Sequence, residues 1–151
     1  MLNPYYVTGF VDGEGCFCVS FSPKRSFKTG WEVRPSFSLS QDKKSRDILF
    51  KLKEFFGCGE IRPSKRDNTY KYEVRSLDNL IEKIIPHFEK YPLQTSKRKD
   101  YIIFKKVVFL MREKKHLSVE GIKEIAHILQ KAPQTGKRIY DLKQFSELVK
   151  V

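Results

Sequence analysis

The amino-acid sequence predicts an α+β domain in which helices cover one face of a single antiparallel sheet. Two pairs of segments alternate apolar and polar residues with the period of half-buried strands, and each pair encloses a polar turn. Segments with apolar residues at helical spacing precede, separate and follow these pairs. The element order is therefore α-β-β-α-β-β-α with additional C-terminal helices, which favours one sheet with a covered and an open face. A chain of 151 residues is short enough to form one domain, residues 1–151.

The first predicted helix spans Pro4–Val11. Proline fits the first turn of a helix, and Asn3 directly before it is a favourable N-cap. The glycine-rich run that begins at Asp12 is expected to end this helix. Helix and glycine-rich turn together form one motif over residues 4–15.

Two strands are expected next, at Cys16–Pro23 and Trp31–Ser40. In both, aromatic or aliphatic residues alternate with serine, cysteine or charged residues, as in a strand with one buried face. The linker over residues 24–30 is basic and ends in the turn former Gly30. The two strands are therefore predicted to form a hairpin.

The remaining segments repeat this arrangement. A helix over Asp42–Gly57 stops at its terminal glycine, and the strands Glu60–Ser64 and Tyr70–Ser76 predict a second hairpin. Leu77–Phe88 has a helical pattern that is broken near Pro86. Further helices are predicted at Arg98–Arg112, at Val119–Gln130 after the N-cap Ser118, and at Asp141–Lys150. The core thus covers residues 4–112, and the C-terminal helices cover residues 118–150.

The charge of the chain favours a polyanionic partner. Thirty Lys and Arg residues against 18 Asp and Glu residues give a formal net charge of +12. Such a charge raises the local concentration of DNA or RNA and speeds its capture, although a generally basic surface has the same composition.

The cysteine pattern and the absence of long apolar runs point to an intracellular protein. Cys16, Cys18 and Cys58 are odd in number and form no CxxC pair, so neither a disulfide framework nor a zinc knuckle is indicated. No apolar run reaches the roughly 20 residues that a transmembrane helix requires. A mitochondrial or chloroplast location remains open, because the gene could be encoded in the organelle.

The open face of the predicted sheet carries small hydrogen-bonding residues and cations, which are suited to contacts with phosphates and base edges. An ordinary solvated sheet face is the alternative. The serine-rich strands and the basic hairpin tips favour nucleic acid. The predicted DNA-binding residues are Ser20, Ser22, Lys24, Arg25, Glu32, Arg34, Ser36, Ser38, Arg62, Ser64, Arg66, Lys71, Glu73 and Arg75.

The motif helix has one side suited to another helix. Gly9 and Gly13 lie one turn apart on the same face as Tyr6, and glycines at this spacing let a second helix approach backbone to backbone. Tyr6, Gly9 and Gly13 are therefore the predicted dimer interface. Val7, Phe10 and Val11, on the other side, are expected to pack into the subunit's own sheet.

Two acids follow in the glycine turn. Asp12 and Glu14 lie where a flexible backbone lets a carboxylate reach toward a hard cation. Glu14 is the candidate Mg²⁺ ligand. A helix end whose acids are merely solvated is the alternative, because a GxxxG followed by acids is a weak signal alone.

The stretch Val7–Gly15 resembles the signature of the LAGLIDADG homing endonucleases, and the element order extends this resemblance over Pro4–Arg112. The resemblance implies a sheet shaped as a DNA-binding saddle and an enzyme of intron homing that makes a double-strand break in a long, near-palindromic DNA site. In the family, two motif helices pack side by side. Because this chain carries a single copy of the motif, a C₂ homodimer is expected.

The family resemblance also assigns roles at the catalytic centre. It implies that Glu14 and the Gly13 carbonyl bind Mg²⁺, with Mn²⁺ as a substitute and Ca²⁺ supporting binding without cleavage. Gln41 and Lys97 match positions that arrange water around the metals. Asp12 is assigned to structural hydrogen bonding. A catalytic arginine of some relatives aligns with Ser45, and Arg46 is its candidate substitute. The predicted catalytic residues are therefore Glu14, Gln41 and Lys97, and the predicted metal ligands are Glu14 and Gly13.

The sequence is also compatible with two other functions. The same scaffold could serve as an intron RNA maturase, or as a DNA-binding protein without catalysis. A Ser-His-Asp triad is not supported, because His87 has no nucleophile partner in the sequence. His116 and His127 are expected to be surface or capping residues.

Overall fold

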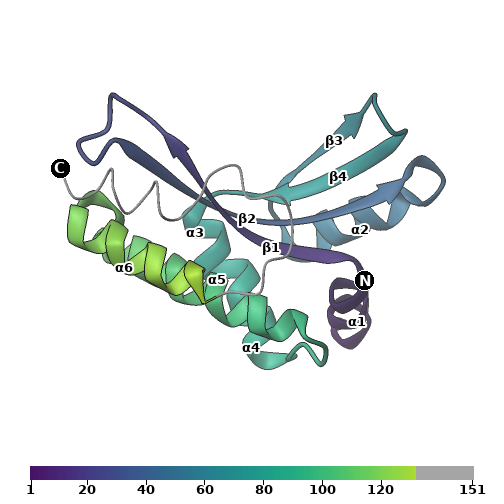
Figure 1. Cartoon of the computed structure of the whole chain (residues 1–151). Coiled ribbons are helices and arrows are strands. Elements are labelled where there is room, and N and C mark those ends of the chain that lie inside the picture. The colour runs from purple at the N-terminus through teal and green to yellow at the C-terminus, as the bar shows by residue number, and fades with distance from the viewer. Residues whose placement is uncertain (132–151) are drawn as a thin grey trace.

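The structure is a computed structural model that describes residues 1–131 (Figure 1). Its strands are β1 (Gly15–Pro23), β2 (Trp31–Asp42), β3 (Glu60–Ser64) and β4 (Thr69–Val74). Its helices are α1 (Pro4–Glu14), η1 (Lys43–Ser45), α2 (Asp47–Phe56), α3 (Leu77–Asn79), η2 (Leu80–Ile84), α4 (Ile85–Lys90), α5 (Lys97–Arg112), η3 (Lys115–Leu117) and α6 (Val119–Gln130). The predicted helix Asp141–Lys150 lies outside the described residues.

The four strands form one antiparallel sheet in the order β1-β2-β4-β3. In Figure 1 the two hairpins rise as the arms of an open saddle, and the helices lie beneath the sheet. Helix α1 lies at the end where β1 starts, and α2 lies under the β3–β4 arm. The predicted α+β class, with one covered and one open sheet face, is confirmed.

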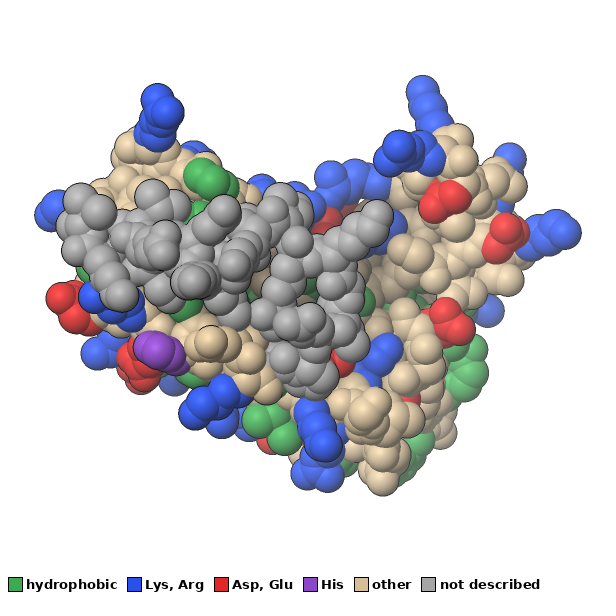
Figure 2. Space-filling view, viewed as in Figure 1, with side chains coloured by type: hydrophobic (Ala, Val, Ile, Leu, Met, Phe, Trp, Pro, Cys, Tyr) green, Lys and Arg blue, Asp and Glu red, His purple; other side chains and the backbone are tan. Residues whose placement is uncertain are grey.

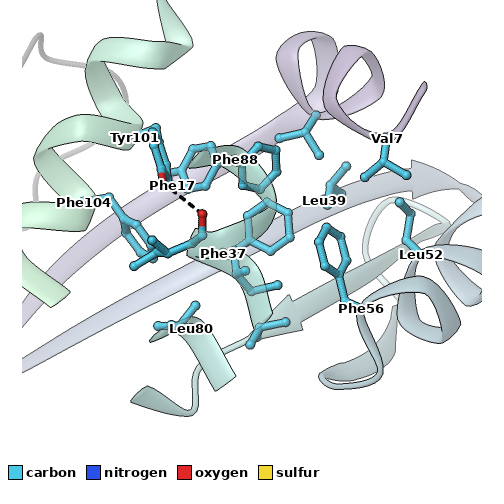
Figure 3. Packing of buried hydrophobic residues seen from close by; sticks show 14 of the residues in the cluster. Val7, Phe17, Phe37, Leu39, Leu52, Phe56, Leu80, Phe88, Tyr101 and Phe104 are labelled. Atoms are coloured by element: carbon cyan, nitrogen blue, oxygen red, sulfur yellow. Dashed lines mark hydrogen bonds between the residues drawn. The ribbon is translucent and has the colours of Figure 1, made fainter. Parts of the chain in front are cut away.

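The core lies between the sheet and the helices. Phe37 of β2 pairs with Phe17 of β1 and Val74 of β4, so the central strands direct apolar side chains to the same face. Figure 3 shows Phe37 surrounded by Phe17, Phe56 and Phe88. The ring centroids of these three residues lie 5.2, 5.7 and 5.8 Å from that of Phe37. Such aromatic packing fixes the relative positions of the strands and helices.

A second apolar cluster supports the β1–β2 arm. Trp31 and Val33 of β2 pack with Met111 of α5 and with Ile122 and Ile125 of α6. Ser118 caps α6 as predicted, since its side chain accepts a hydrogen bond from the Gly121 N–H. Helix α6 therefore supports the sheet beneath its first hairpin.

The main differences from the sequence prediction lie in three helical segments. Helix α1 continues past Val11 to Glu14, so the two acids belong to its last turn. The Asp42–Gly57 segment is a 3₁₀ turn followed by α2, which ends at Gly57 with the predicted left-handed backbone (φ 68°). The break near Pro86 is a π-helical turn over Leu80–Ile84, after which Pro86 occupies the first turn of α4, where its missing N–H is harmless.

His87 of α4 is hydrogen-bonded to Thr8 of the motif helix α1. The Thr8 hydroxyl donates to the Tyr91 carbonyl at 2.9 Å, so it accepts from Nε2 of His87 at 3.0 Å. The imidazole also packs edge-on against Phe55 and Phe56. Burial lowers the pKa of His87 from 6.5 to about 4. The side chain is therefore neutral in the folded protein at neutral pH.

We expect acid to destabilise the fold through His87. Between about pH 6.5 and 4, the unfolded chain takes up a proton at this residue and the folded chain does not, so the free energy of unfolding falls as the pH falls. Denaturant unfolding at pH 7.5 and 4.5 measures the loss. It should be smaller in His87→Gln, whereas His127→Gln, at an exposed position of α6, should match the wild type. An equal loss in His87→Gln and wild type would contradict this assignment.

Candidate functional site

The end of α1 places Glu14 at the surface, where the helix passes directly into β1. The backbone N–H of Gly15 donates to the Val11 carbonyl. A Cβ at Gly15 would lie 2.6 Å from Cγ1 of Val11 and 2.8 Å from its carbonyl oxygen, so only glycine permits this tight junction. Glu14 itself is exposed. The junction therefore leaves a carboxylate accessible beside the start of the sheet.

Gln41 and Lys97 come to the same place from distant segments. Nε2 of Gln41 lies 3.4 Å from Oε2 of Glu14 and donates to the Ser40 carbonyl at 2.9 Å. Nζ of Lys97 donates to the carbonyl of Gly15, the residue next to Glu14. Lys97 begins α5, and Gln41 lies in β2. The structure thus brings the three predicted catalytic residues together from a helix end, a strand and a helix start.

Asp12 makes this convergence possible. Its carboxylate accepts hydrogen bonds from the backbone N–H of Gln94 at 2.7 Å, the backbone N–H of Thr95 at 3.2 Å and the Thr95 hydroxyl at 2.7 Å. Burial alone would raise the pKa of Asp12, but these bonds outweigh it and hold the pKa below its ordinary value. The predicted structural role of Asp12 is confirmed, since it ties the segment before Lys97 to the motif helix.

The oxygen donors at this site suit a hard cation. Mg²⁺ prefers carboxylate, carbonyl and water oxygens, and Glu14 with the neighbouring backbone carbonyls supplies the first two kinds. The Gly15 carbonyl accepts from Lys97, and Glu14 and the Gly13 carbonyl are the candidate ligands of this chain. Within residues 1–131, no three His, Cys, Asp or Glu side chains are grouped to hold a metal ion.

One side of α1 is open. Gly9 and Gly13 are exposed, and a Cβ built on either of them would meet no atom within 4 Å. Tyr6 is exposed on the same side, with its ring stacked on Phe10. Val7 and Val11, on the opposite side, are completely buried. The helix therefore has one side committed to the subunit core and a flat side free to receive another helix.

The open face of the sheet consists of short cross-strand rows. Ser20 lies opposite Arg34 and Ser22 opposite Glu32 on the β1–β2 arm. On the other arm Lys71 lies opposite Arg62. Figure 2 shows Lys and Arg side chains at the upper ends of both arms, around the concave surface. The face combines hydroxyl groups along the strands with cations toward the hairpin ends.

Each arm also carries a carboxylate among its cations. Glu32 of β2 lies 3.2 Å from Nζ of Lys24 and 3.9 Å from Nε of Arg34. Glu73 of β4 contacts three cations, which are Arg62 at 2.8 Å, Lys71 at 3.4 Å and Arg75 at 2.9 Å. Both acids therefore pair with basic side chains of the face in the free subunit.

Comparison with known proteins places this geometry in a family. The sequence model of the family described as LAGLIDADG endonuclease matches residues 7–108. The chain belongs to the LAGLIDADG endonuclease family. The matched region includes Glu14, Gln41 and Lys97 and all four strands of the sheet.

Individual relatives agree with this membership. A probable intron-encoded endonuclease 2 of Neurospora crassa is 41% identical over 125 residues, which are 82% of this chain and 28% of that protein. A crystal structure of the homing endonuclease I-TnaI superposes with a TM-score of 0.89 at 38% identity and covers 98% of both chains. I-SmaMI bound to an uncleaved DNA target in the presence of calcium ions gives a TM-score of 0.82 at 43% identity, over 85% of this chain and 44% of that chain.

The relatives of this LAGLIDADG chain differ in length. It spans about a quarter of the length of the first curated relatives, from 24% to 28%. It spans slightly less than half of the I-SmaMI chain and nearly the whole of the I-TnaI chain.

Most residues predicted to face DNA lie on the open side of the LAGLIDADG saddle, but two of them are buried. Ser38 is 7% exposed and Glu73 is 6% exposed, because both lie in the centre of the sheet between neighbouring strands. Arg46, the candidate substitute arginine, donates to the Tyr70 hydroxyl at 3.2 Å and stacks over its ring. His116, expected at the surface, is partly buried, and its Nδ1 atom has no hydrogen-bond partner among the described residues.

The sequence prediction omitted several residues of this face. Cys16 and Cys18 are exposed on the open side of β1, opposite Ser38 and Ser36, and Ser40 is exposed on β2. Strand alternation alone would have found them, since they share the parity of Ser20 and Ser36. Although both residues are exposed, partial desolvation by the neighbouring strands raises the pKa of both thiols, so they are protonated at neutral pH.

Within the described part of the chain, no helix is long and apolar enough to cross a membrane.

Proposed function

We propose that this chain is one subunit of a homodimeric, Mg²⁺-dependent endonuclease that makes a double-strand break in a long, near-palindromic DNA site. The observation that carries the proposal is the meeting of Glu14, Gln41 and Lys97 at the end of a helix whose other side is open. A carboxylate, an amide and an amine at one accessible point can bind a cation and orient water.

The arrangement of α1 supports the proposed homodimer. Its open side carries Gly9 and Gly13, and packing of two such helices would bring two Glu14 carboxylates to one centre. A two-fold axis at that centre implies a DNA site whose halves are related by near symmetry. The relative I-TnaI, a homing endonuclease, matches 98% of this chain and is itself covered to 98%.

The saddle provides the DNA-binding surface. Two subunits would carry twice the charge of +12, which favours a long track of phosphates. Cations near the hairpin ends would contact phosphates, while Ser20, Ser36 and Arg34 lie where side chains can reach base edges in the major groove. The I-SmaMI complex, a relative of the same fold, is bound to a DNA target.

The residues at the catalytic centre divide the work. Glu14 and the Gly13 carbonyl would hold Mg²⁺, which Mn²⁺ would replace because its size and ligand preference are similar. The metal supplies Lewis-acid stabilisation of charge in phosphodiester hydrolysis. Gln41, fixed by its bond to the Ser40 carbonyl, orients water at the carboxylate. Lys97 places a positive charge beside the junction where negative charge accumulates.

The biological setting follows from the relatives' names. A relative described as intron-encoded supports an intron as the location of this gene, and intron homing as the process. An organelle such as the mitochondrion is the proposed compartment.

Selection of cleaved sites from a random duplex library tests the function. With Mg²⁺ we expect cut sites of approximate two-fold symmetry, and with Ca²⁺ the same sites should be bound and left intact. Recovery of asymmetric sites would argue against the homodimer. Recovery of no cut sites, with intron RNA bound instead, would favour the maturase function.

A further inference from the structure

We propose that Glu73 is a positioning residue that makes the β3–β4 arm selective for DNA sequence. It holds three cations in one arrangement before DNA is bound, and it acts through them rather than by touching a base. The inference rests on the proposed DNA-binding function and assigns a role to one acid within that surface.

The carboxylate of Glu73 lies deeper than the cations around it. The Glu73 side chain is 5% exposed, whereas its partners Arg62, Lys71 and Arg75 are 60%, 47% and 55% exposed. Glu73 therefore lies beneath cations that reach the surface above it. A buried carboxylate cannot accept a hydrogen bond from a base unless these cations move away.

The two carboxylate oxygens of Glu73 are shared among the three cations. Oε1 accepts from Nη2 of Arg62 at 2.8 Å and contacts Nε of Arg75 at 2.9 Å, and Oε2 lies 3.4 Å from Nζ of Lys71. Each of the two arginine contacts uses one nitrogen of a guanidinium that has five N–H donors. Both arginines therefore keep donors for DNA while one of their nitrogens is fixed.

The strand register explains why the three cations meet here. Lys71 and Glu73 are two residues apart on one face of β4, and Arg75 follows at the same spacing. Arg62 of β3 lies directly opposite Lys71. The Glu73 carboxylate is thus at the centre of a cluster of three cations. Arg62 belongs to β3, Lys71 belongs to β4, and Arg75 directly follows β4.

The negative charge of Glu73 indicates that the cluster does more than attract phosphates. A surface designed only to attract phosphates gains nothing from an acid, because its negative charge opposes the attraction. Three unpaired cations at this spacing would repel one another and adopt many side-chain rotamers. Glu73 removes this freedom before binding, so the arginines meet base edges with a fixed geometry.

Two variants that differ only in position separate charge from positioning. Glu73→Gln and Glu60→Gln each remove one negative charge from the same cross-strand row, since Glu60 pairs with Glu73 across β3 and β4. The Glu60 side chain is 79% exposed, and its ion pair is a 3.9 Å contact with Lys53 of α2. Affinities are measured in Ca²⁺ for the duplex selected by the wild type and for a scrambled duplex, over a range of salt concentrations.

We expect both variants to bind the scrambled duplex slightly more tightly. Only Glu73→Gln should lower the ratio of selected to scrambled affinity, by about ten-fold or more, which is the discrimination carried by one well-placed arginine contact. Sites reselected by Glu73→Gln should be less defined at the positions under this arm. A ratio in Glu73→Gln equal to that of Glu60→Gln would overturn the inference.

Glu73→Asp provides a second test if Glu73→Gln fails to fold. It keeps the charge but is one methylene shorter and cannot reach all three cations, so the ratio should fall while the salt dependence stays that of the wild type. An unchanged ratio in Glu73→Asp would also overturn the inference. If the wild type itself prefers no duplex, the proposed function fails first, and the positioning role fails with it.

Discussion

Glu14→Gln is expected to bind its DNA site in Ca²⁺ nearly as tightly as the wild type and to cut it at least about a thousand-fold more slowly in Mg²⁺. A bound metal contributes several kcal/mol to a phosphoryl-transfer transition state, and each 1.36 kcal/mol is worth a factor of ten. Glutamine keeps the shape of the side chain and its bond to Gln41 but loses the charge that holds the cation. Single-turnover cleavage and equilibrium binding on one selected duplex measure the two effects.

Glu60→Gln is the matched control for this experiment. It makes the same chemical change on the open face, away from the end of α1, and should cut at close to the wild-type rate. Undiminished cleavage by Glu14→Gln would assign the chemistry to another group. Loss of both binding and cleavage would instead show that Glu14 supports the structure of the saddle.

Gly9→Leu is expected to convert the proposed dimer into a monomer without harming the fold of the subunit. A Cβ at Gly9 meets nothing within its own chain, and leucine is a better helix former than glycine by about 0.8 kcal/mol. The free energy of unfolding of the subunit should therefore not fall. Across a two-fold axis two leucines would collide, and overpacking of about 1.5 kcal/mol on each side raises the dimer dissociation constant about a hundred-fold.

Sedimentation velocity and denaturant unfolding together test this prediction. Lys123→Leu, at an exposed position of α6, adds the same side chain far from α1 and should leave the assembly unchanged. Double-strand cleavage should disappear with the dimer. A Gly9→Leu protein that remains dimeric would place the interface elsewhere, and a wild-type protein that is monomeric on DNA would remove the basis for a two-fold site.

Much of the fold could be predicted from local pattern. Alternation placed the two hairpins within two residues of their final bounds, and Gly57 correctly marked the end of α2. The end of α1 was predicted three residues too early, because glycine in the sequence suggests a stop. In the structure the helix continues to Glu14, since the Gly15 N–H still reaches the Val11 carbonyl.

The candidate site divides between local and long-range information. The motif identified Glu14 and the open side of α1, because both depend on residues a few positions apart. The bonds between Asp12 and Thr95 join residues 83 positions apart, and neither spacing nor composition predicts such contacts. Glu73 was predicted to face DNA from its strand parity. Its burial under three cations depends on side-chain packing across two strands, which parity does not contain.

The three glycines of the motif are present for different physical reasons. Gly15 is required by the chain itself, since any side chain there strikes Val11, whereas Gly9 and Gly13 leave room that only a second helix would use. A descendant that was selected for folding alone would therefore keep Gly15 and tolerate larger residues at the other two positions. Loss of those two glycines would therefore indicate that the chain no longer packs against a second helix, even while the fold of the subunit is unchanged.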